Sequence, residues 1–275
     1  MPFTPSHIAA VLPFVRRPVT GWAYAPAALA IGSMIPDVPL FTRRWPAYAE
    51  THSVKGILTV DVLATCAVVA LYYLVFRTAL LQLLPRAVGD RIRPPTRLRQ
   101  PAHLVWVPVA AVFGAATHAF WDSFTHARSV TIWGSALGTQ VLGLPLYKLL
   151  QYLSGLFGLI VLAAWALFRL RRFTPQPSPG LRLGSRTRVT ALALLVVATG
   201  IGAVWSVLTT PHPDELAWHL HWAAIGGCSL AALATTAYAA LFTVVQAAAR
   251  TISGRALPPR SETTASGVPS GPSTP

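Results

Sequence analysis

The residues best suited to chemistry lie in segment 117–126, which reads THAFWDSFTH. In a helix, His118, Asp122 and His126 follow an i, i+4, i+8 spacing and project from one face. Imidazole and carboxylate groups four residues apart can share a metal ion. His118 and His126 are about 12 Å apart along a continuous helix, which is too far for one ion. Either the helix ends near Ser123 and His126 folds back, or two ions lie side by side with Asp122 between them.

The composition indicates which environment holds these residues. The chain has 275 residues, of which 53% are hydrophobic and 11% charged, with a mean hydropathy of +0.53. Soluble domains carry roughly a quarter charged residues, so this is an integral membrane protein whose expected partner is the lipid bilayer. The net charge of +14 comes mostly from residues between apolar runs. That placement is typical of orientation signals, and we expect no nucleic-acid partner.

The apolar runs predict an all-α, polytopic transmembrane helix bundle. Two shorter apolar stretches, 6–15 and 22–36, are interrupted by Pro13, Pro18 and Pro26, and we expect them to form an N-terminal pair of short membrane helices. Residues 1–250 then form one integral membrane domain. Residues 251–275 are rich in Pro, Ser, Thr and Gly, and we expect a disordered cytoplasmic tail. The five expected spans are 59–84, 103–124, 149–169, 189–209 and 220–248.

Charge in the loops predicts the orientation. Loops 85–102 and 170–188 hold five arginines each, whereas loop 125–148 holds one Arg and one Lys, and loop 210–219 holds no basic residue other than His. Basic loops stay in the cytoplasm. The C-terminal end of the second span, with His118 and Asp122, therefore faces the extracytoplasmic side.

Several other polar residues reach the same membrane depth. His52 precedes the outer end of the first span, and Asp37 follows the 22–36 stretch. An acid in or at the end of a span is costly unless it is paired or binds an ion, so Asp37 and Asp122 favour a functional role. Simpler readings remain open, because Asp37 can cap a helix after Pro36 and Asp61 can cap the first span.

Four ordered motifs carry a resemblance. The segments PFTPSHIAAVLP, GSMIPDVPLF, THSVKG and THAFWDSFTH together resemble the bacterial membrane-protein family DUF4184, a domain of unknown function, over about residues 1–245. The order of the motifs is also similar to predicted membrane-bound metal-dependent hydrolases and, more distantly, to zinc-dependent phospholipase C. The resemblance implies metal ligands at His7, Asp37, His52, His118, Asp122 and His126. The chain lacks a later His-x3-Glu pair, which favours one or two ions over three.

The N-terminal segment allows two arrangements. If 22–41 forms a full sixth span, Arg16, Arg17 and His7 lie in the cytoplasm, and His7 can never meet Asp122. If 6–15 and 22–36 form a short hairpin entered from outside, His7 reaches the same pocket as Asp37 and His52. The hairpin is favoured because it brings together the ligand set that the resemblance implies.

Two functional hypotheses follow. The first is a membrane-embedded metal-dependent hydrolase in which Asp37 and Asp122 are the catalytic carboxylates. A divalent ion, with zinc favoured, would activate a water molecule against a phosphoester or a lipid-linked substrate. The second is a non-catalytic metal-binding membrane protein or a transporter. A transporter is expected to show repeat symmetry and ionisable groups near the midplane, and the sequence shows neither.

Overall fold

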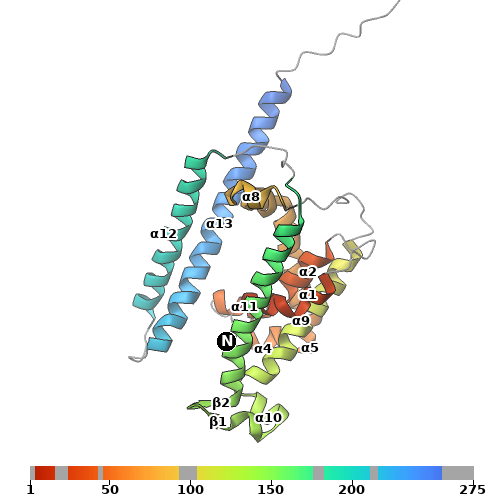
Figure 1. The fold of residues 1–275 in the computed structure, drawn as a ribbon, viewed down its shortest axis with the longest axis vertical. Coiled ribbons are helices and arrows are strands. Elements are labelled where there is room, and N and C mark those ends of the chain that lie inside the picture. Colours follow the sequence, from red (N-terminus) through yellow and green to blue (C-terminus); the bar gives the residue numbers. More distant parts are fainter. Residues whose placement is uncertain are drawn as a thin grey trace, which may run out of the picture.

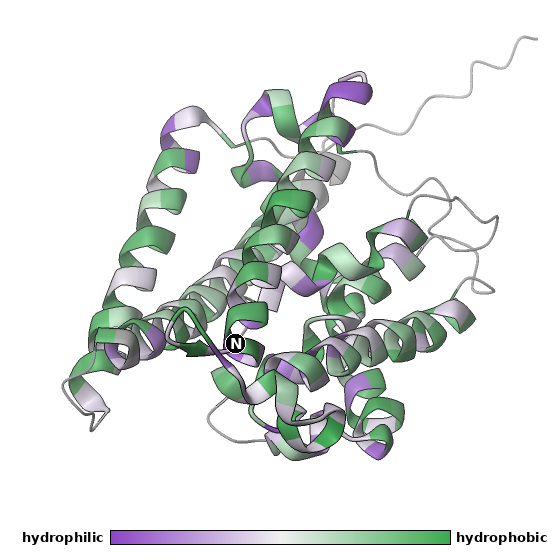
Figure 2. Cartoon of the chain, turned by 60° about the horizontal axis from the view of Figure 1, so that its bottom comes forward, coloured by the Kyte–Doolittle hydropathy of each residue, from purple (hydrophilic) through white to green (hydrophobic). Residues whose placement is uncertain are grey.

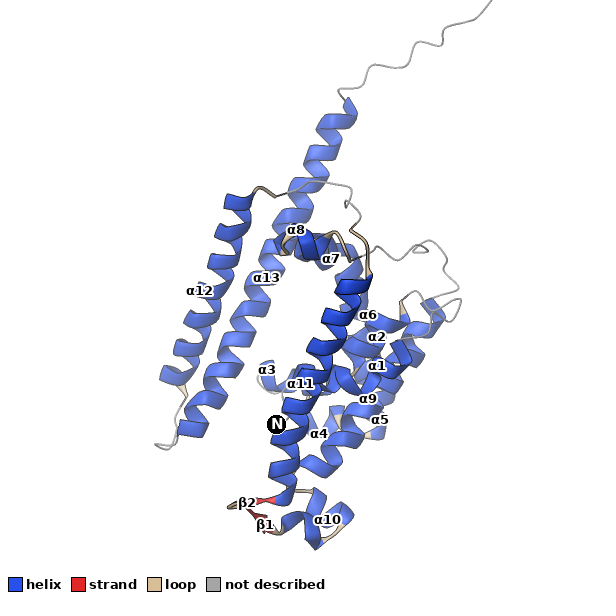
Figure 3. Cartoon of the chain, viewed as in Figure 1, coloured by secondary structure: helices blue, strands red, loops and turns tan. Residues whose placement is uncertain are grey.

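The computed structural model describes residues 4–15, 24–42, 46–92, 104–175, 183–210 and 216–255, and these residues are almost entirely helical (Figure 1, Figure 3). One two-stranded antiparallel hairpin, β1 with β2, lies at the end of the molecule from which α11 starts. The elements are η1 (Thr4–His7), α1 (Ile8–Val15), α2 (Ala25–Gly32), η2 (Ile35–Asp37), α3 (Val38–Phe41), α4 (Tyr48–Thr51), α5 (Val54–Gly56), η3 (Ile57–Asp61), α6 (Val62–Leu71), η4 (Tyr72–Phe76), α7 (Arg77–Leu83), α8 (Arg86–Gly89), α9 (Trp106–Thr125), α10 (Ser129–Trp133), η6 (Ser135–Gly138), β1 (Gln140–Val141), β2 (Leu144–Pro145), α11 (Leu146–Arg172), α12 (Ser185–Thr209) and α13 (Leu216–Arg255).

Within the described residues, four helices are long and apolar enough to cross a membrane, so the chain is a multi-pass membrane protein. They are Val54–Leu83, which joins α5 to α7 through the π-helical turns η3 and η4, then α11, α12 and residues Trp218–Ala249 of α13. Figure 2 shows these helices hydrophobic along most of their length, with hydrophilic residues concentrated at their ends. A helix satisfies its backbone hydrogen bonds internally, which a lipid environment requires.

The predicted second span differs from the other four. Residues 106–125 do form a 20-residue helix, α9, but it is not among the helices apolar enough to cross by composition. Its last three turns carry Thr117, His118 and Asp122, and these polar residues lower its hydropathy. The count of five spans is therefore not confirmed, and a crossing by α9 stays a prediction.

The N-terminal stretches form two short apolar helical segments, Thr4–Val15 and Ala25–Phe41. Pro13 lies inside α1 without ending it, and Pro26 lies in the first turn of α2, where its missing N–H costs nothing. Pro18 lies outside the described residues. At the other end of the chain, α13 continues through 251–255, and the rest of the predicted tail, 256–275, lies outside the described residues.

Small residues bring α2 and α9 into direct contact. A Cβ at Gly32 would lie 2.8 Å from the carbonyl oxygen of Ala111, and one at Gly114 would lie 2.6 Å from that of Leu29. The hydrophobic core around this contact joins α1, α2, α6 and α9; its buried members are Val11, Tyr24, Ala25, Ala28, Leu29, Val69, Val107 and Ala110. This N-terminal half forms the scaffold of the site described below.

Helices α12 and α13 form a separate antiparallel pair (Figure 1). Gly202 and Gly226 face each other there, and a Cβ on either would collide with the backbone of the other. The pair joins the rest of the bundle through Phe242 and Ala239, which pack on Ala79 of α7. At the same end, Arg188 of α12 donates a hydrogen bond to the carbonyl oxygen of Leu84 (3.1 Å).

The first span begins earlier than the sequence suggested, and this overturns the reading of Asp61 as its N-cap. The helix starts at Val54, and Ser53 caps it by accepting a hydrogen bond from the backbone N–H of Gly56 (3.0 Å). Asp61 lies two turns further along, in the helix interior, and is fully buried.

The close contact of α12 with α13 predicts a sharp difference between two neighbouring glycines. Gly202→Val should lower the free energy of unfolding by about 1–3 kcal/mol, because the added side chain must push the helices apart. Gly200→Val should have little effect, because nothing lies within 4 Å of a Cβ at that position. Thermal unfolding of the two variants in the same detergent measures the difference, and equal melting temperatures would contradict the packing.

The predicted orientation can be tested by cysteine labelling. In a background with Cys66 and Cys228 replaced by Ser, Ser135→Cys should react with a membrane-impermeant maleimide in intact cells. Ala87→Cys should react only after permeabilisation, because it lies in the Arg-rich loop at the opposite end of the first span. The reverse pattern would place the site on the cytoplasmic side.

Candidate metal centre

Helix α9 supplies two buried residues of the site, His118 and Asp122, one turn apart. The absence of a side chain at Gly114 lets the end of α2 lie directly on α9. The backbone carbonyl oxygen of Ser33 then comes 2.8 Å from Nδ1 of His118. A carbonyl can only accept, so Nδ1 carries the proton and the lone pair of Nε2 faces the site.

Asp37 approaches His118 from η2, immediately after α2. Its Oδ2 accepts a hydrogen bond from the Thr4 hydroxyl (2.7 Å), and its Oδ1 lies 3.6 Å from Nε2 of His118. Asp37 occupies the N-cap position of α3, but its side chain makes no capping hydrogen bond. Its carboxylate points into the site instead, so the capping reading of Asp37 is wrong.

His52 enters at the end of the short helix α4. Its Nδ1 lies 3.0 Å from the carbonyl oxygen of Tyr48, and its Nε2 lies 3.5 Å from Oδ2 of Asp122. Thr51 fixes this segment by donating a hydrogen bond to the carbonyl oxygen of Pro36 (2.8 Å). The His52 side chain is therefore fully buried and held in one orientation.

Tyr48 is a site residue that the sequence reading missed. Its hydroxyl donates a hydrogen bond to Oδ2 of Asp122 (3.3 Å), and its ring stacks on His52 with centroids 3.9 Å apart. Burial, followed by the charge of Asp122, raises the pKa of Tyr48 above its usual value, so the phenol stays a donor. The spacing of Tyr48 four residues before His52 was the only available signal.

His7 reaches the site from η1. Gly158 of α11 makes room for this segment, because a Cβ there would lie 2.8 Å from the carbonyl oxygen of Ser6. Nε2 of His7 lies 3.5 Å from Oδ1 of Asp122, and its ring stacks on that of His118 at 3.8 Å. Burial lowers the pKa of His7 to about 4, so its imidazole is neutral at pH 7. The contact between His7 and Asp122 is the one expected for the N-terminal hairpin, whereas a full sixth span would keep these two residues apart.

His126 lies at the edge of the site. Helix α9 ends at Thr125, two residues later than the position near Ser123, and the backbone of His126 is extended. The ring folds back as one alternative required, but Nδ1 lies 3.0 Å from the backbone carbonyl oxygen of Asp122 and 3.6 Å from Oδ2. Its side chain is 23% exposed, whereas those of His52 and His118 are fully buried.

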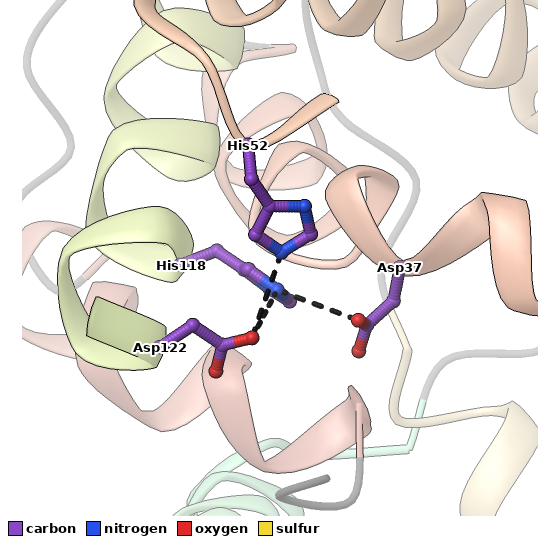
Figure 4. A group of neighbouring side chains, drawn as sticks. All are labelled: Asp37, His52, His118 and Asp122. Atoms are coloured by element: carbon purple, nitrogen blue, oxygen red, sulfur yellow. Dashed lines mark ion pairs between the residues drawn. The ribbon is translucent and has the colours of Figure 1, made fainter. Parts of the chain in front are cut away.

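The four central residues form a compact set of donors (Figure 4). Asp37, His52, His118 and Asp122 each offer one ligand atom, and these atoms all lie within 4.8 Å of one another. Five buried atoms here have no hydrogen-bond partner: Nε2 of His7, His52 and His118, and Oδ1 of Asp37 and Asp122. Leaving buried polar atoms unpaired costs about 1–3 kcal/mol each, or more for charged groups. Neutral imidazoles and carboxylates facing one another fit a divalent metal ion, which Asp37, His52, His118 and Asp122 could hold.

Residues around the ligands hold them in place. Thr4, three residues before His7, orients Asp37, and the carbonyl groups of Ser33 and Tyr48 orient the two imidazoles. The carbonyl contact between Ser33 and His118 joins residues 85 positions apart and has no sequence signature. Ser154 accepts a hydrogen bond from the Trp121 indole N–H (3.1 Å), and this bond connects α11 to α9.

Comparison with known families agrees with the motif reading. Residues 1–245 match the family model described as Domain of unknown function (DUF4184). The chain belongs to the DUF4184 family. No curated protein and no solved structure matches it. The site of this DUF4184 protein must therefore be interpreted from its own geometry.

The geometry predicts which substitutions remove the metal. His118→Ala and Asp122→Asn should each lower the affinity for Zn²⁺ by more than the roughly 10–100-fold typical of losing a residue that only orients a ligand, since each removes a ligand atom. Metal content of protein purified in detergent, measured by mass spectrometry after zinc loading, provides the readout. His219→Ala, outside the site, should keep the wild-type stoichiometry. Wild-type protein that takes up neither zinc nor manganese would contradict the assignment.

Proposed function

We propose that this protein is a membrane-embedded, metal-dependent hydrolase whose site faces the extracytoplasmic side. Asp37, His52, His118 and Asp122 hold a divalent ion, with zinc preferred, and His7 lies against the same carboxylate. The observation that carries the proposal is the set of unpartnered imidazole and carboxylate atoms facing one another. Two carboxylates and neutral imidazoles balance the charge of one divalent ion, which favours binding in a buried site.

The arrangement suits hydrolysis by an activated water molecule. A bound Zn²⁺ ion lowers the pKa of its water to about 7 and polarises a phosphoryl or carbonyl oxygen. Asp37 and Asp122 are the proposed catalytic carboxylates, because Oδ1 of each remains without a hydrogen-bond partner. Nε2 of His7 also has no hydrogen-bond partner and faces Oδ1 of Asp122 at 3.5 Å. The Tyr48 hydroxyl holds the other oxygen of Asp122 in place.

The surroundings of the site suit a substrate at the lipid headgroup level. Trp133 of α10 stacks on Phe124 with centroids 4.4 Å apart, and its indole N–H donates to the Ser123 hydroxyl (3.0 Å). Trp121 and Trp133 are 42% and 50% exposed next to this end of α9. Aromatic rings with a satisfied polar group are enriched at membrane interfaces. We therefore favour a phosphoester of a lipid or of a lipid-linked molecule.

A non-catalytic metal-binding protein is the second candidate. The observation in its favour is burial: Asp37, His118 and Asp122 are at most 1% exposed. Closed sites are typical of structural metal ions, whereas catalytic ions keep an open position. A transporter is the variant of this candidate in which the ion itself is moved.

The Tyr48→Phe substitution distinguishes a catalytic site from a site that only binds metal. It removes a hydroxyl that orients Asp122 but no ligand atom, so the zinc content should stay near wild type while turnover falls about 10–100-fold. The assay uses metal-loaded protein in lipid nanodiscs with phosphomonoester, phosphodiester and lipid phosphate substrates. Asp122→Asn should abolish turnover, and His219→Ala should preserve it. Stoichiometric metal without turnover of any of these substrates would establish the non-catalytic alternative.

A further inference from the structure

A second group of buried oxygens lies inside the first span, outside the His/Asp centre. Asp61 and Thr65 are both 0% exposed, and none of their three side-chain oxygens has a hydrogen-bond partner. They lie one turn apart on the buried face of the helix, between Ile57 and Val69. This face packs against α2 and α9. The three oxygens therefore face the protein interior rather than lipid.

Thr65 differs from four other threonines of the long helices. The hydroxyls of Thr59, Thr199, Thr236 and Thr243 each donate to the carbonyl oxygen four residues earlier, at 2.7–2.8 Å. This local bond is the usual way for a helical threonine to satisfy its hydroxyl in an apolar environment. Thr65 is more buried than these residues and still lacks the bond. Its hydroxyl is free to bind something else.

The backbone next to Asp61 is irregular as well. Residues Ile57–Asp61 form the π-helical turn η3, which ends at this carboxylate. A π-turn shifts carbonyl groups out of the regular i→i−4 pairing and is frequent at functional sites. Within membranes, irregular backbone is tolerated where it lines a cavity or binds an ion. The π-turn and the two unpartnered side chains thus coincide in one place.

Charge decides what kind of ligand this group would take. Among the described residues, no ion pair involves Asp61, and an uncompensated carboxylate inside a membrane span is costly. The candidate ligand atoms, two from the Asp61 carboxylate and one from the Thr65 hydroxyl, are all oxygens. Oxygen ligands suit hard cations rather than the ions that imidazole prefers. One carboxylate balances one positive charge, whereas a divalent ion would leave an excess charge in the membrane interior.

We propose that Asp61 and Thr65 form a binding site for a monovalent cation of the Na⁺ type, distinct from the His/Asp centre. The ion binds to the Asp61 carboxylate and the Thr65 hydroxyl, on the buried face that supports α9. It neutralises the carboxylate where the first span packs against the scaffold of the metal centre. The site depends on no property of the proposed hydrolase reaction.

Sodium-dependent stability tests the proposal. Purified protein in detergent is melted in NaCl and in choline chloride at equal ionic strength. A ligand that binds only the folded state raises stability by RT ln(1 + [L]/Kd), so Tm should rise by a few degrees for each tenfold increase of NaCl above Kd. Asp61→Asn and Thr65→Val should each remove this sodium-specific rise. Thr236→Val is the matched control, because that hydroxyl is bonded within its own helix.

Three outcomes would overturn the proposal. Equal melting curves in NaCl and choline chloride would show that the effect is salt screening or that Asp61 holds a proton. A full sodium response in Thr65→Val would separate Thr65 from the site. Loss of bound zinc in Asp61→Asn would assign Asp61 to the His/Asp centre instead. Because zinc content and hydrolysis are measured separately, failure of the sodium site leaves the proposed function untouched.

Discussion

The carboxylate of Asp122 is the group on which the arrangement of the N-terminal half depends. His7, His52, His118 and His126 all lie within 3.5–3.6 Å of it, and the Tyr48 hydroxyl donates to it. These residues come from three separate segments of the chain. A buried carboxylate in a membrane protein must be neutralised, and convergence of imidazoles without a cation would leave their nitrogens unpaired. The metal ion that we propose is therefore part of the packing as well as of the chemistry.

The helix contacts explain how such a polar centre is held in an apolar protein. Glycines at positions 32 and 114 let α2 and α9 touch through their backbones, and this contact brings a carbonyl group against His118. Gly158 does the same for the segment that carries His7. A methyl group at either contact with α9 would lie 2.6–2.8 Å from a backbone carbonyl oxygen, so the two helices would have to move apart. Small residues thus determine the geometry of the site without contributing a ligand.

The two halves of the molecule serve different purposes in this view. The short N-terminal helices, α4 and α9 carry the polar centre, while α11, α12 and α13 are long apolar helices. Helix α11 contacts the site segments through Gly158 and Ser154, and α13 contacts α3 through a hydrogen bond from the Ser229 hydroxyl to the carbonyl oxygen of Phe41 (3.2 Å). The pair of α12 and α13 attaches to α7 further along the first span. The proposed sodium site lies in the part of that span which packs against α2 and α9.

The amino-acid sequence by itself determined the membrane environment and most of the helices, because long apolar runs have no other stable structure in lipid. It also placed Asp37, His52, His118 and Asp122 at one membrane depth, and their side chains do converge, with ligand atoms within 4.8 Å of one another. Only the tertiary structure decided the positions and contacts of individual side chains. The position of Asp61 depended on a helix start at Val54, and that of His126 on a helix end at Thr125. Tyr48 contacts Asp122, and the Ser33 carbonyl group contacts His118. Both contacts join segments that are far apart in the chain, and sequence spacing does not encode such contacts.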